Sequence, residues 1–319
     1  MTVSDSVTIV DVAVGVIVQD DGKFLLTCRP RGKPYAGYWE FPGGKIEPGE
    51  TSLSALNREL QEELGIQLLK AEPWITRNFK YVHAAVRLHF FRVTQWQGNP
   101  VARESQQLAW QYPRQITVSP MLPANTPILR ALSLPSVYAI TQASQIGAKA
   151  AVQQIKQALQ HGLRLIQIRE KAMNGTALQA FSKIVIELAH ESGAQVLVNG
   201  DSTLCRELGA DGIHLTASQL MDLFERPDMK YGWCGASCHN LEELHQAELL
   251  GIDFAVLGPV LPTLSHPATK PLGWRKFANL INDCSIPVYA LGGLQPDDLS
   301  SAREMGAHGV AMIRGIDCL

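Results

Sequence analysis

Three glutamates in one short stretch, Glu59, Glu62 and Glu63, have the spacing of a metal-dependent site. Residues three and four positions apart lie on the same face of an α-helix, so their carboxylates project together. Like charges held so close repel one another unless a hard cation binds between them, and Mg²⁺ and Mn²⁺ are cations of this kind. Because such cations also bind phosphate oxygens, the spacing predicts Mg²⁺ or Mn²⁺ and phosphoryl chemistry.

A helix over residues 52–64 is expected to position these glutamates. Its apolar residues recur at spacings of three and four, and Gly65 supplies a helix stop. Before the helix, Gly43 and Gly44 lie in the glycine- and proline-rich segment 31–49. Glycines there allow the backbone to approach a metal ion and a phosphate closely.

The string Gly44-x5-Glu50-x7-Arg58-Glu59-Leu60-x-Glu62-Glu63-x-Gly65-Ile66 resembles the Nudix box at every defining position. With this resemblance, Glu59 is the candidate base, and Arg58 is expected to orient a glutamate through a charge-assisted hydrogen bond. The candidate metal ligands are Gly43, Glu59, Glu62 and Glu63.

Two further tracts narrow the resemblance to the MutT-type 8-oxo-dGTP diphosphatases. They are residues 39–47, WEFPGGKIE, and residues 122–128, LPANTPI. The resemblance implies that Asn125 reads the oxidised purine through its amide, that Arg29 contacts the nucleotide and that Phe41 lines the base pocket. A side-chain amide suits this task because it offers a hydrogen-bond donor and an acceptor together.

Three more residues complete the expected hydrolase site, and one departs from the pattern. Glu40 and Pro42 join the substrate-binding candidates, and Glu104 falls where the subfamily keeps another catalytic carboxylate. The departure is Pro34, which stands where a side-chain hydrogen bond to the ligand is expected. Without that hydrogen bond, the loop 30–38 is expected to close less tightly over a substrate.

The first part of the chain, residues 1–132, has the pattern of a compact α/β/α sandwich. Residues 8–18 and 24–27 are predicted to form a hairpin across the turn at Gly22, and 79–81 and 86–93 are further β-rich runs. The helix 52–64 and a short helix over 127–132 complete the unit. Residues 133–136 are interpreted as a linker.

Residues 137–319 alternate strands and helices regularly, which predicts a (β/α)8 TIM-type barrel. The eight expected strands are 137–141, 165–169, 196–199, 212–215, 233–237, 254–258, 288–292 and 310–313. Few residues follow the last strand, so the last helix is expected to be missing or short. The barrel wall left uncovered predicts a partner, either the first domain or a second copy of the chain in a homodimer.

The barrel resembles the thiamine-phosphate synthase and TenI-like family in several strand-end motifs, where barrel enzymes assemble their sites. The motifs are YAIT (138–141), QIREK (167–171), LGADGIHL (208–215), GPVLPT (258–263) and ALGGL (290–294). The resemblance implies thiazole phosphate or thiamine phosphate as a ligand. The candidate residues are Gln167, Arg169, Lys171, Asn199, Ser237, His239, Thr263, Gly292 and Gly293.

Departures from this family argue against synthase activity. Gly200 follows Asn199, and residues 216–218 are TAS, where the family keeps acidic Mg²⁺ ligands. The phosphate loop 263–266 is TLSH and lacks its lysine. Asn199-Gly200 and the SCH tract at 237–239 are closer to TenI, a thiazole tautomerase, which makes His239 a candidate for proton transfer. His214 is expected to be buried and hydrogen-bonded.

Composition excludes several other classes of protein. The chain is 46% hydrophobic and 18% charged, with a formal net charge of −2, so no basic field for DNA, RNA or an anionic membrane is expected. No run of residues is long and apolar enough to span a bilayer, and the start lacks a signal-like core. The six cysteines lack a CxxC pair and are interpreted as reduced thiols. A cytoplasmic enzyme with a small-molecule substrate is expected.

These patterns predict a hydrolase that converts 8-oxo-dGTP to 8-oxo-dGMP and pyrophosphate and so removes a mutagenic precursor from the nucleotide pool. In this interpretation the barrel is a degenerate module of the thiamine-phosphate synthase and TenI-like kind. The fusion of the two domains leaves an alternative open. In it, the Nudix domain hydrolyses a thiamine diphosphate analogue, and the barrel is a thiazole-phosphate tautomerase or a sensor.

Overall fold

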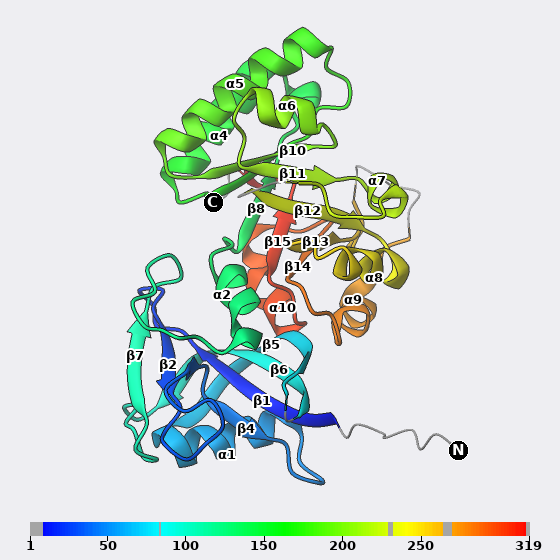
Figure 1. The fold of residues 1–319 in the computed structure, drawn as a ribbon. Coiled ribbons are helices and arrows are strands. Elements are labelled where there is room, and N and C mark those ends of the chain that lie inside the picture. The colour runs from blue at the N-terminus through cyan, green and yellow to red at the C-terminus, as the bar shows by residue number, and fades with distance from the viewer. Residues whose placement is uncertain (1–8, 83, 229–231, 264–269, 317–319) are drawn as a thin grey trace, which may run out of the picture. The chain divides into compact units, whose positions relative to one another are not determined.

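The computed structural model describes residues 9–82, 84–228, 232–263 and 270–316 (Figure 1). The chain divides into two compact units, Met1–Ser133 and Leu134–Leu319. Within the described residues, no helix has the length and apolar character needed to cross a membrane.

The first unit is built from two β-sheets and two main helices. Strands β1 (Ile9–Ile17), β4 (Gly43–Lys45), β5 (Gln67–Lys80) and β6 (Ala85–Gln97) form a mixed sheet in the order β4-β1-β6-β5. A smaller sheet has the order β3-β2-β7, from β2 (Phe24–Cys28), β3 (Trp39–Glu40) and β7 (Gln107–Gln111). The helices are α1 (Ser52–Leu64) and α2 (Thr126–Leu132), the latter preceded by the 3-10 turn η1 (Pro123–Asn125).

Strand β1 separates two apolar clusters because alternate side chains of a strand point to opposite faces. Ala13 and Ile17 pack with the buried leucines of α1. Val14 and Val16 pack in a second cluster that includes Ile128 of α2. The expected α/β/α sandwich is confirmed by this arrangement of layers.

The predicted hairpin is wrong beyond its turn. Gln19 N donates to the Lys23 carbonyl at 2.8 Å, and a single bridge joins Val18 to Phe24. The two strands then enter different sheets, because β1 pairs along its whole length with β6, whereas β2 pairs with β7 and β3. Long-range pairing therefore overrides the local signal. The short strands β3 and β4 also lie in the glycine- and proline-rich segment 31–49, for which no strand was predicted.

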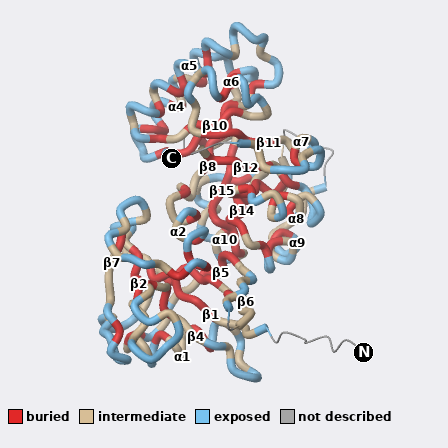
Figure 2. The backbone as a smooth tube through the Cα atoms, viewed as in Figure 1, coloured by how far each residue is buried: buried red, intermediate tan, exposed pale blue. Residues whose placement is uncertain are grey.

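The second unit is a closed barrel of eight parallel strands, as predicted (Figure 1). The strands are β8 (Val137–Ile140), β9 (Leu165–Ile168), β10 (Gln195–Asn199), β11 (Gly212–Leu215), β12 (Trp233–Cys238), β13 (Phe254–Leu257), β14 (Val288–Leu291) and β15 (Gly309–Met312). Figure 2 shows these strands as largely buried backbone. One set of side chains, with Tyr138, Phe254 and Tyr289, fills the barrel interior, and the alternate set packs under the helices.

The barrel helices are unequal in length. They are α3 (Ala143–Ile146), α4 (Ala148–Gln160), α5 (Gly175–Glu191), α6 (Ser202–Glu207), α7 (Ala217–Asp222), α8 (Leu241–Leu249), α9 (Gly273–Ile281) and α10 (Leu299–Glu304), with the 3-10 turn η2 (Pro296–Asp298) before α10. In the part of the chain that the structure describes, no α-helix follows β15. This agrees with the expectation of a missing or short last helix.

Candidate functional site

Helix α1 carries the glutamates and is fixed at both ends. Thr51 Oγ1 accepts a hydrogen bond from Ser54 N at 3.1 Å, and Gly65 ends the helix at φ 70°. The buried leucines on one side fix the rotation of the helix. The side chain of Glu59 is consequently only 17% exposed, whereas that of Glu62 is 56% exposed.

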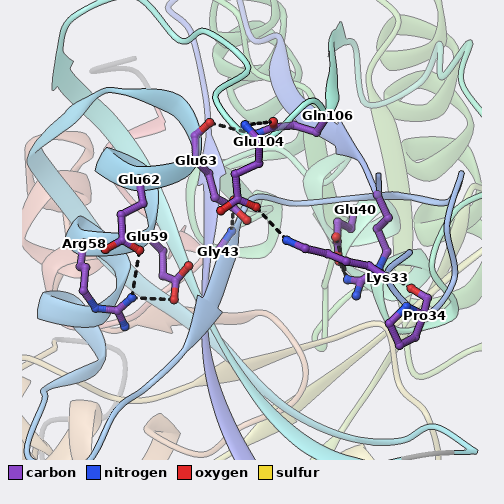
Figure 3. Close-up of polar contacts among 11 residues, drawn as sticks. Lys33, Pro34, Glu40, Gly43, Arg58, Glu59, Glu62, Glu63, Glu104 and Gln106 are labelled. Atoms are coloured by element: carbon purple, nitrogen blue, oxygen red, sulfur yellow. Dashed lines mark hydrogen bonds and ion pairs between the residues drawn. The ribbon is translucent and has the colours of Figure 1, made fainter. Parts of the chain in front are cut away.

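Two glycines bring the backbone of β4 close to α1. Gly43 has φ 145°, and a Cβ at this position would overlap the carbonyl of Ala13 in β1. A Cβ at Gly44 would overlap the Glu59 carboxylate. Gly43 N donates to Glu63 Oε2 at 3.2 Å (Figure 3). The lack of side chains at Gly43 and Gly44 thus lets two helix carboxylates approach the backbone of β4.

Arg58 joins the helix to the loop before it. Its Nε and Nη2 donate to the two carboxylate oxygens of Glu50, each at 2.9 Å, and its Nη1 donates to Glu59 Oε1 at 2.8 Å. Nη2 also donates to the carbonyl of Lys45. The hydrogen bonds from Arg58 lower the pKa of Glu50 to about 2. Arg58 therefore holds Glu59 in place.

Glu63 lies at the centre of a group of carboxylates. Burial raises its pKa to about 8, and the charges of Glu40, Glu104 and Glu59 add to this increase, against the lowering effect of the Gly43 N–H. A divalent cation would relieve both the repulsion and the loss of hydration, so these oxygen donors suit Mg²⁺ or Mn²⁺.

The carboxylates of α1 already have partners. Arg58 binds Glu59, and the N–H of Gly43 binds Glu63. Among the described residues, no group of three acidic, histidine or cysteine side chains converges into a preformed metal cage.

Arg29, a predicted nucleotide contact, is bound to its own loop. Its Nη1 donates to both carboxylate oxygens of Glu40, at 2.8 and 2.7 Å, and its Nε donates to the carbonyl of Pro34 at 2.7 Å. Burial raises the pKa of Glu40, while the charge of Arg29 acts in the opposite direction. Pro34 has no polar side chain, and its backbone carbonyl instead provides the contact to Arg29.

Asn125 lies beside the WEFP tract. Trp39 N donates to the Pro120 carbonyl and Leu122 N to the Trp39 carbonyl, which ties the segment before η1 to β3. Phe41 is 3% exposed and belongs to the apolar cluster that also contains residues of η1 and α2. Asn125 is 4% exposed, and its Nδ2 has no hydrogen-bond partner among the residues that the structure describes.

Pro42, the last member of the tract, acts through its backbone. Its carbonyl accepts a hydrogen bond from Gly15 N at 2.8 Å, which fixes the tract to β1. Pro42 itself is buried. The hydrogen bond at Pro42 thus helps to fix the backbone of the two glycines that follow it.

Glu104 forms an ion pair with Lys33, a residue that no sequence motif indicated. Lys33 Nζ lies 2.7 Å from Glu104 Oε2 (Figure 3). Glu104 N donates to Gln106 Oε1 at 2.7 Å, and Gln106 Nε2 donates to the carbonyl of Glu63 at 2.8 Å. Lys33 and Gln106 were missed because the contacts from Lys33 to Glu104 and from Gln106 to Glu63 join segments that are distant in the sequence.

A chain of hydrogen bonds crosses the barrel interior and ends at Ser237. Gln167 Nε2 donates to Tyr138 Oη at 3.1 Å, and Tyr138 Oη lies 3.2 Å from His214 Nδ1. His214 Nε2 lies 3.0 Å from Ser237 Oγ. His214 is fully buried, as expected, and burial lowers its pKa to about 3, so that it is neutral. Tyr138 was not identified from the sequence.

The other barrel candidates have different surroundings. Asn199 Nδ2 donates to the His214 carbonyl at 3.2 Å, and burial lowers the pKa of Arg169. Lys171 is exposed. His239 Nδ1 lies 2.9 Å from Glu243 Oε2, so the proton-transfer candidate has a carboxylate of α8 as its partner.

The glycines after β14 pack against the loop after β13. Gly292 and Gly293 have φ 107° and 70°, and a Cβ at either would overlap this loop. Leu261 N donates to the Gly292 carbonyl at 3.0 Å. Thr263 is the last described residue of that loop, and the remaining positions of the expected phosphate loop, 264–266, lie outside the described residues.

Polar residues near the expected metal positions of the barrel stabilise the backbone. Glu170 accepts hydrogen bonds from the N–H groups of Ala143 and Ser144 at the start of α3. Thr216 caps α7, and Gln219 Nε2 donates to the Gly200 carbonyl at 2.7 Å. Thr216 and Gln219 thus stabilise the backbone around positions 200 and 216–218, where the sequence has no acidic side chains.

Comparisons with known proteins match the two units separately. The NUDIX domain matches residues 10–132, and the family described as thiamine monophosphate synthase matches residues 137–316. The first unit is 38% identical over 124 residues to the 8-oxo-dGTP diphosphatase of Haemophilus influenzae, covering 39% of this chain and 91% of the relative. It is 40% identical over 118 residues to the CTP pyrophosphohydrolase of Escherichia coli, covering 37% of this chain and 87% of the relative.

The barrel has relatives of its own. It is 33% identical over 186 residues to the thiamine-phosphate synthase of Desulfitobacterium hafniense (strain Y51), covering 57% of this chain and 88% of the relative. The chain therefore belongs to two families, the NUDIX domain family through residues 10–132 and the thiamine monophosphate synthase family through residues 137–316.

Proposed function

We propose that the first unit hydrolyses 8-oxo-dGTP to 8-oxo-dGMP and pyrophosphate with Mg²⁺ or Mn²⁺. The Nδ2 of buried Asn125, which has no hydrogen-bond partner among the described residues, carries this proposal. Guanine presents acceptors at both O6 and N7. 8-Oxoguanine instead presents an acceptor at O6 and an N–H at position 7, so one amide can donate to the first and accept from the second. The oxidised base thus satisfies Asn125 better than guanine does.

The side chains of α1 provide the catalytic groups in this proposal. Bound metal ions supply polarisation of the phosphoryl group and lower the pKa of the attacking water. Gly43, Glu59, Glu62 and Glu63 would hold them. Glu59, oriented by Arg58 at 2.8 Å, accepts the proton of the water whose oxygen forms the new bond to phosphorus. The bond to the bridging oxygen breaks, which releases the monophosphate and pyrophosphate.

The test measures pyrophosphate release from 8-oxo-dGTP, dGTP and CTP with Mg²⁺ in the purified full chain. We expect a strong preference for 8-oxo-dGTP in the wild-type protein and no activity in Glu63→Ala. Asn125→Ala should hydrolyse 8-oxo-dGTP and dGTP at similar, low rates. If CTP is preferred, or if Asn125→Ala keeps the preference for the oxidised nucleotide, the proposed substrate is wrong.

The alternative substrate is a thiamine diphosphate analogue, which the fusion to the barrel suggests. Hydrolysis of such a compound releases phosphate and a thiamine-type monophosphate, so it is measured separately from nucleotide turnover. Turnover of thiamine diphosphate together with negligible activity on all three nucleotides would favour this alternative.

The barrel is proposed to bind thiazole phosphate or thiamine phosphate without synthase activity. The glycine pair at 292–293 and the partly buried Arg169 support binding of a phosphate, whereas Gly200 replaces an acidic ligand. Calorimetry with each compound, followed by an assay for turnover, separates the outcomes. Turnover indicates an enzyme, binding alone indicates a sensor, and neither indicates a scaffold.

In the cell, the proposed reaction would remove an oxidised precursor before DNA replication uses it. The substrate is a small cytoplasmic nucleotide, so this function requires no direct contact with DNA. A homodimer is one of the two alternatives predicted from the uncovered barrel wall, and sedimentation of the purified chain at several concentrations tests it.

A further inference from the structure

An ion pair links two loops at the edge of the carboxylate group in the first unit. Lys33 lies between β2 and β3, and Glu104 lies between β6 and β7. Lys33 Nζ is 2.7 Å from Glu104 Oε2 (Figure 3). The ammonium is also close enough to Glu63 and Glu40 for their charges to interact with it. The positive charge of Lys33 therefore acts on three carboxylates, those of Glu104, Glu63 and Glu40.

Two arginines of the same site are held by several groups. Arg29 donates to both oxygens of Glu40 and to the Pro34 carbonyl. Arg58 donates to Glu50, to Glu59 and to the Lys45 carbonyl. Releasing either guanidinium breaks several hydrogen bonds at once and frees a carboxylate that is largely shielded from water.

The pair of Lys33 and Glu104 is easier to exchange. Their side chains are 49% and 42% exposed, and an ion pair so exposed to water contributes little net stability. A lysine also has a flexible stem and donors that can rotate. Of these three cations, Lys33 is thus the one that can change partner with the smallest loss.

We propose that Lys33 is a phosphate-binding residue, which Glu104 holds in the free protein and which the polyphosphate of the substrate takes over on binding. The inference rests on the proposed function in that the ligand is a nucleoside triphosphate. Arrival of the substrate then also frees Glu104, the predicted additional catalytic carboxylate. The contact from Arg29 to Pro34 keeps the loop in place during this exchange.

The test measures binding of the α,β-methylene analogue of 8-oxo-dGTP with Mg²⁺ by calorimetry. The methylene group replaces the bridging oxygen, so the proposed hydrolysis cannot occur during the titration. Lys33→Ala should raise the dissociation constant about tenfold, as loss of one charge-assisted contact predicts, and Lys33→Arg should restore most of the affinity. Lys23→Ala is the matched control, because Lys23 pairs with exposed Asp21 at the opposite end of β2, and its affinity should equal that of the wild type.

A second comparison separates phosphate binding from a tie between the loops. Glu104→Gln removes the ion pair but leaves Lys33 in place. We expect Lys33→Ala to weaken binding in the Glu104→Gln background as well. If Lys33→Ala and Glu104→Gln weaken binding equally and the double variant is no weaker, Lys33 only ties the loops and the inference is overturned. Absence of analogue binding to the wild type also overturns it.

The outcomes for Lys33 and for the substrate are distinguishable. Suppose that the wild type hydrolyses 8-oxo-dGTP, and that the wild type and Lys33→Ala bind the analogue with the same affinity. This result refutes the inference about Lys33 and leaves the proposed substrate standing. Binding that depends on Lys33, together with no preference for 8-oxo-dGTP over dGTP, supports the inference and refutes the proposed substrate.

Discussion

The carboxylate of Glu59 occupies the space that a side chain at Gly44 would need. The backbone of Gly44 is not in the left-handed region, so the neighbour, and not the conformation, restricts this position. The glycine of β4 and the glutamate of α1 therefore form one unit in which a single methyl group would displace the candidate base.

Gly44→Ala is expected to lower kcat about 100-fold, because displacement of a catalytic group by about 1 Å has an effect of this size. Steady-state hydrolysis of 8-oxo-dGTP and a thermal melt of the same sample test this. The control is Gly175→Ala, at the start of α5, where a Cβ meets open space. The control should keep wild-type activity, and full activity in Gly44→Ala would show that Glu59 has no fixed role.

Glu63 predicts that stability depends on pH in the metal-free protein. Its pKa is raised to about 8 in the folded chain from an ordinary value of 4.5, so the folded state binds more protons than the unfolded state between these values. The contribution of this group is therefore full below about pH 4.5 and is lost as the pH rises through about 8. Melting temperatures in EDTA should fall over this range.

Two comparisons assign that dependence to Glu63. Glu63→Gln cannot ionise and should flatten the profile in EDTA. Mg²⁺ should stabilise the wild type most at high pH, where the carboxylate is ionised and can bind the cation. A wild-type profile that is level between pH 5 and pH 8 would contradict the assigned environment of Glu63.

Arg58→Lys should lower kcat about 10-fold or more, because one ammonium cannot replace a fork of donors that binds Glu50 and Glu59 together. A second measurement is the pKa of Glu50 by NMR, which should rise from about 2 towards 4.5. Arg87→Lys is the control, since the contact of Arg87 to Asp11 is long, at 3.9 Å. An unchanged pKa of Glu50 in Arg58→Lys would show that the fork is not needed.

Tyr138→Phe should reduce the stability of the barrel by about 1–3 kcal/mol, the usual loss when buried polar groups lose a partner. The variant keeps the ring but removes the hydroxyl that joins Gln167 to His214. Denaturant unfolding followed by circular dichroism measures the change. Tyr112→Phe is the control because its side chain is 40% exposed, and nucleotide hydrolysis should be the same in both variants.

Much of the fold was predictable because its signals lie within short segments of sequence. The leucine spacing of 52–64 and the stop at Gly65 gave helix α1, and the alternation of apolar strands and helices after residue 136 gave the barrel. The hairpin prediction failed beyond Gly22 because the choice of partner for a strand depends on distant segments. β6 is such a segment, since it lies about 70 residues from β1 and pairs with its whole length.

The sequence by itself determined the kinds of chemistry, since the glutamate spacing, the glycines and the strand-end motifs are local patterns. Only the tertiary structure decided which contacts those residues make. Lys33 meets Glu104 across 71 positions, and Gln167, Tyr138, His214 and Ser237 form one chain from four different strands. The high pKa of Glu63 and the buried Nδ2 of Asn125, unpartnered among the described residues, likewise arise from burial. Burial and long-range contacts depend on how distant segments pack, and no short stretch of sequence contains that information.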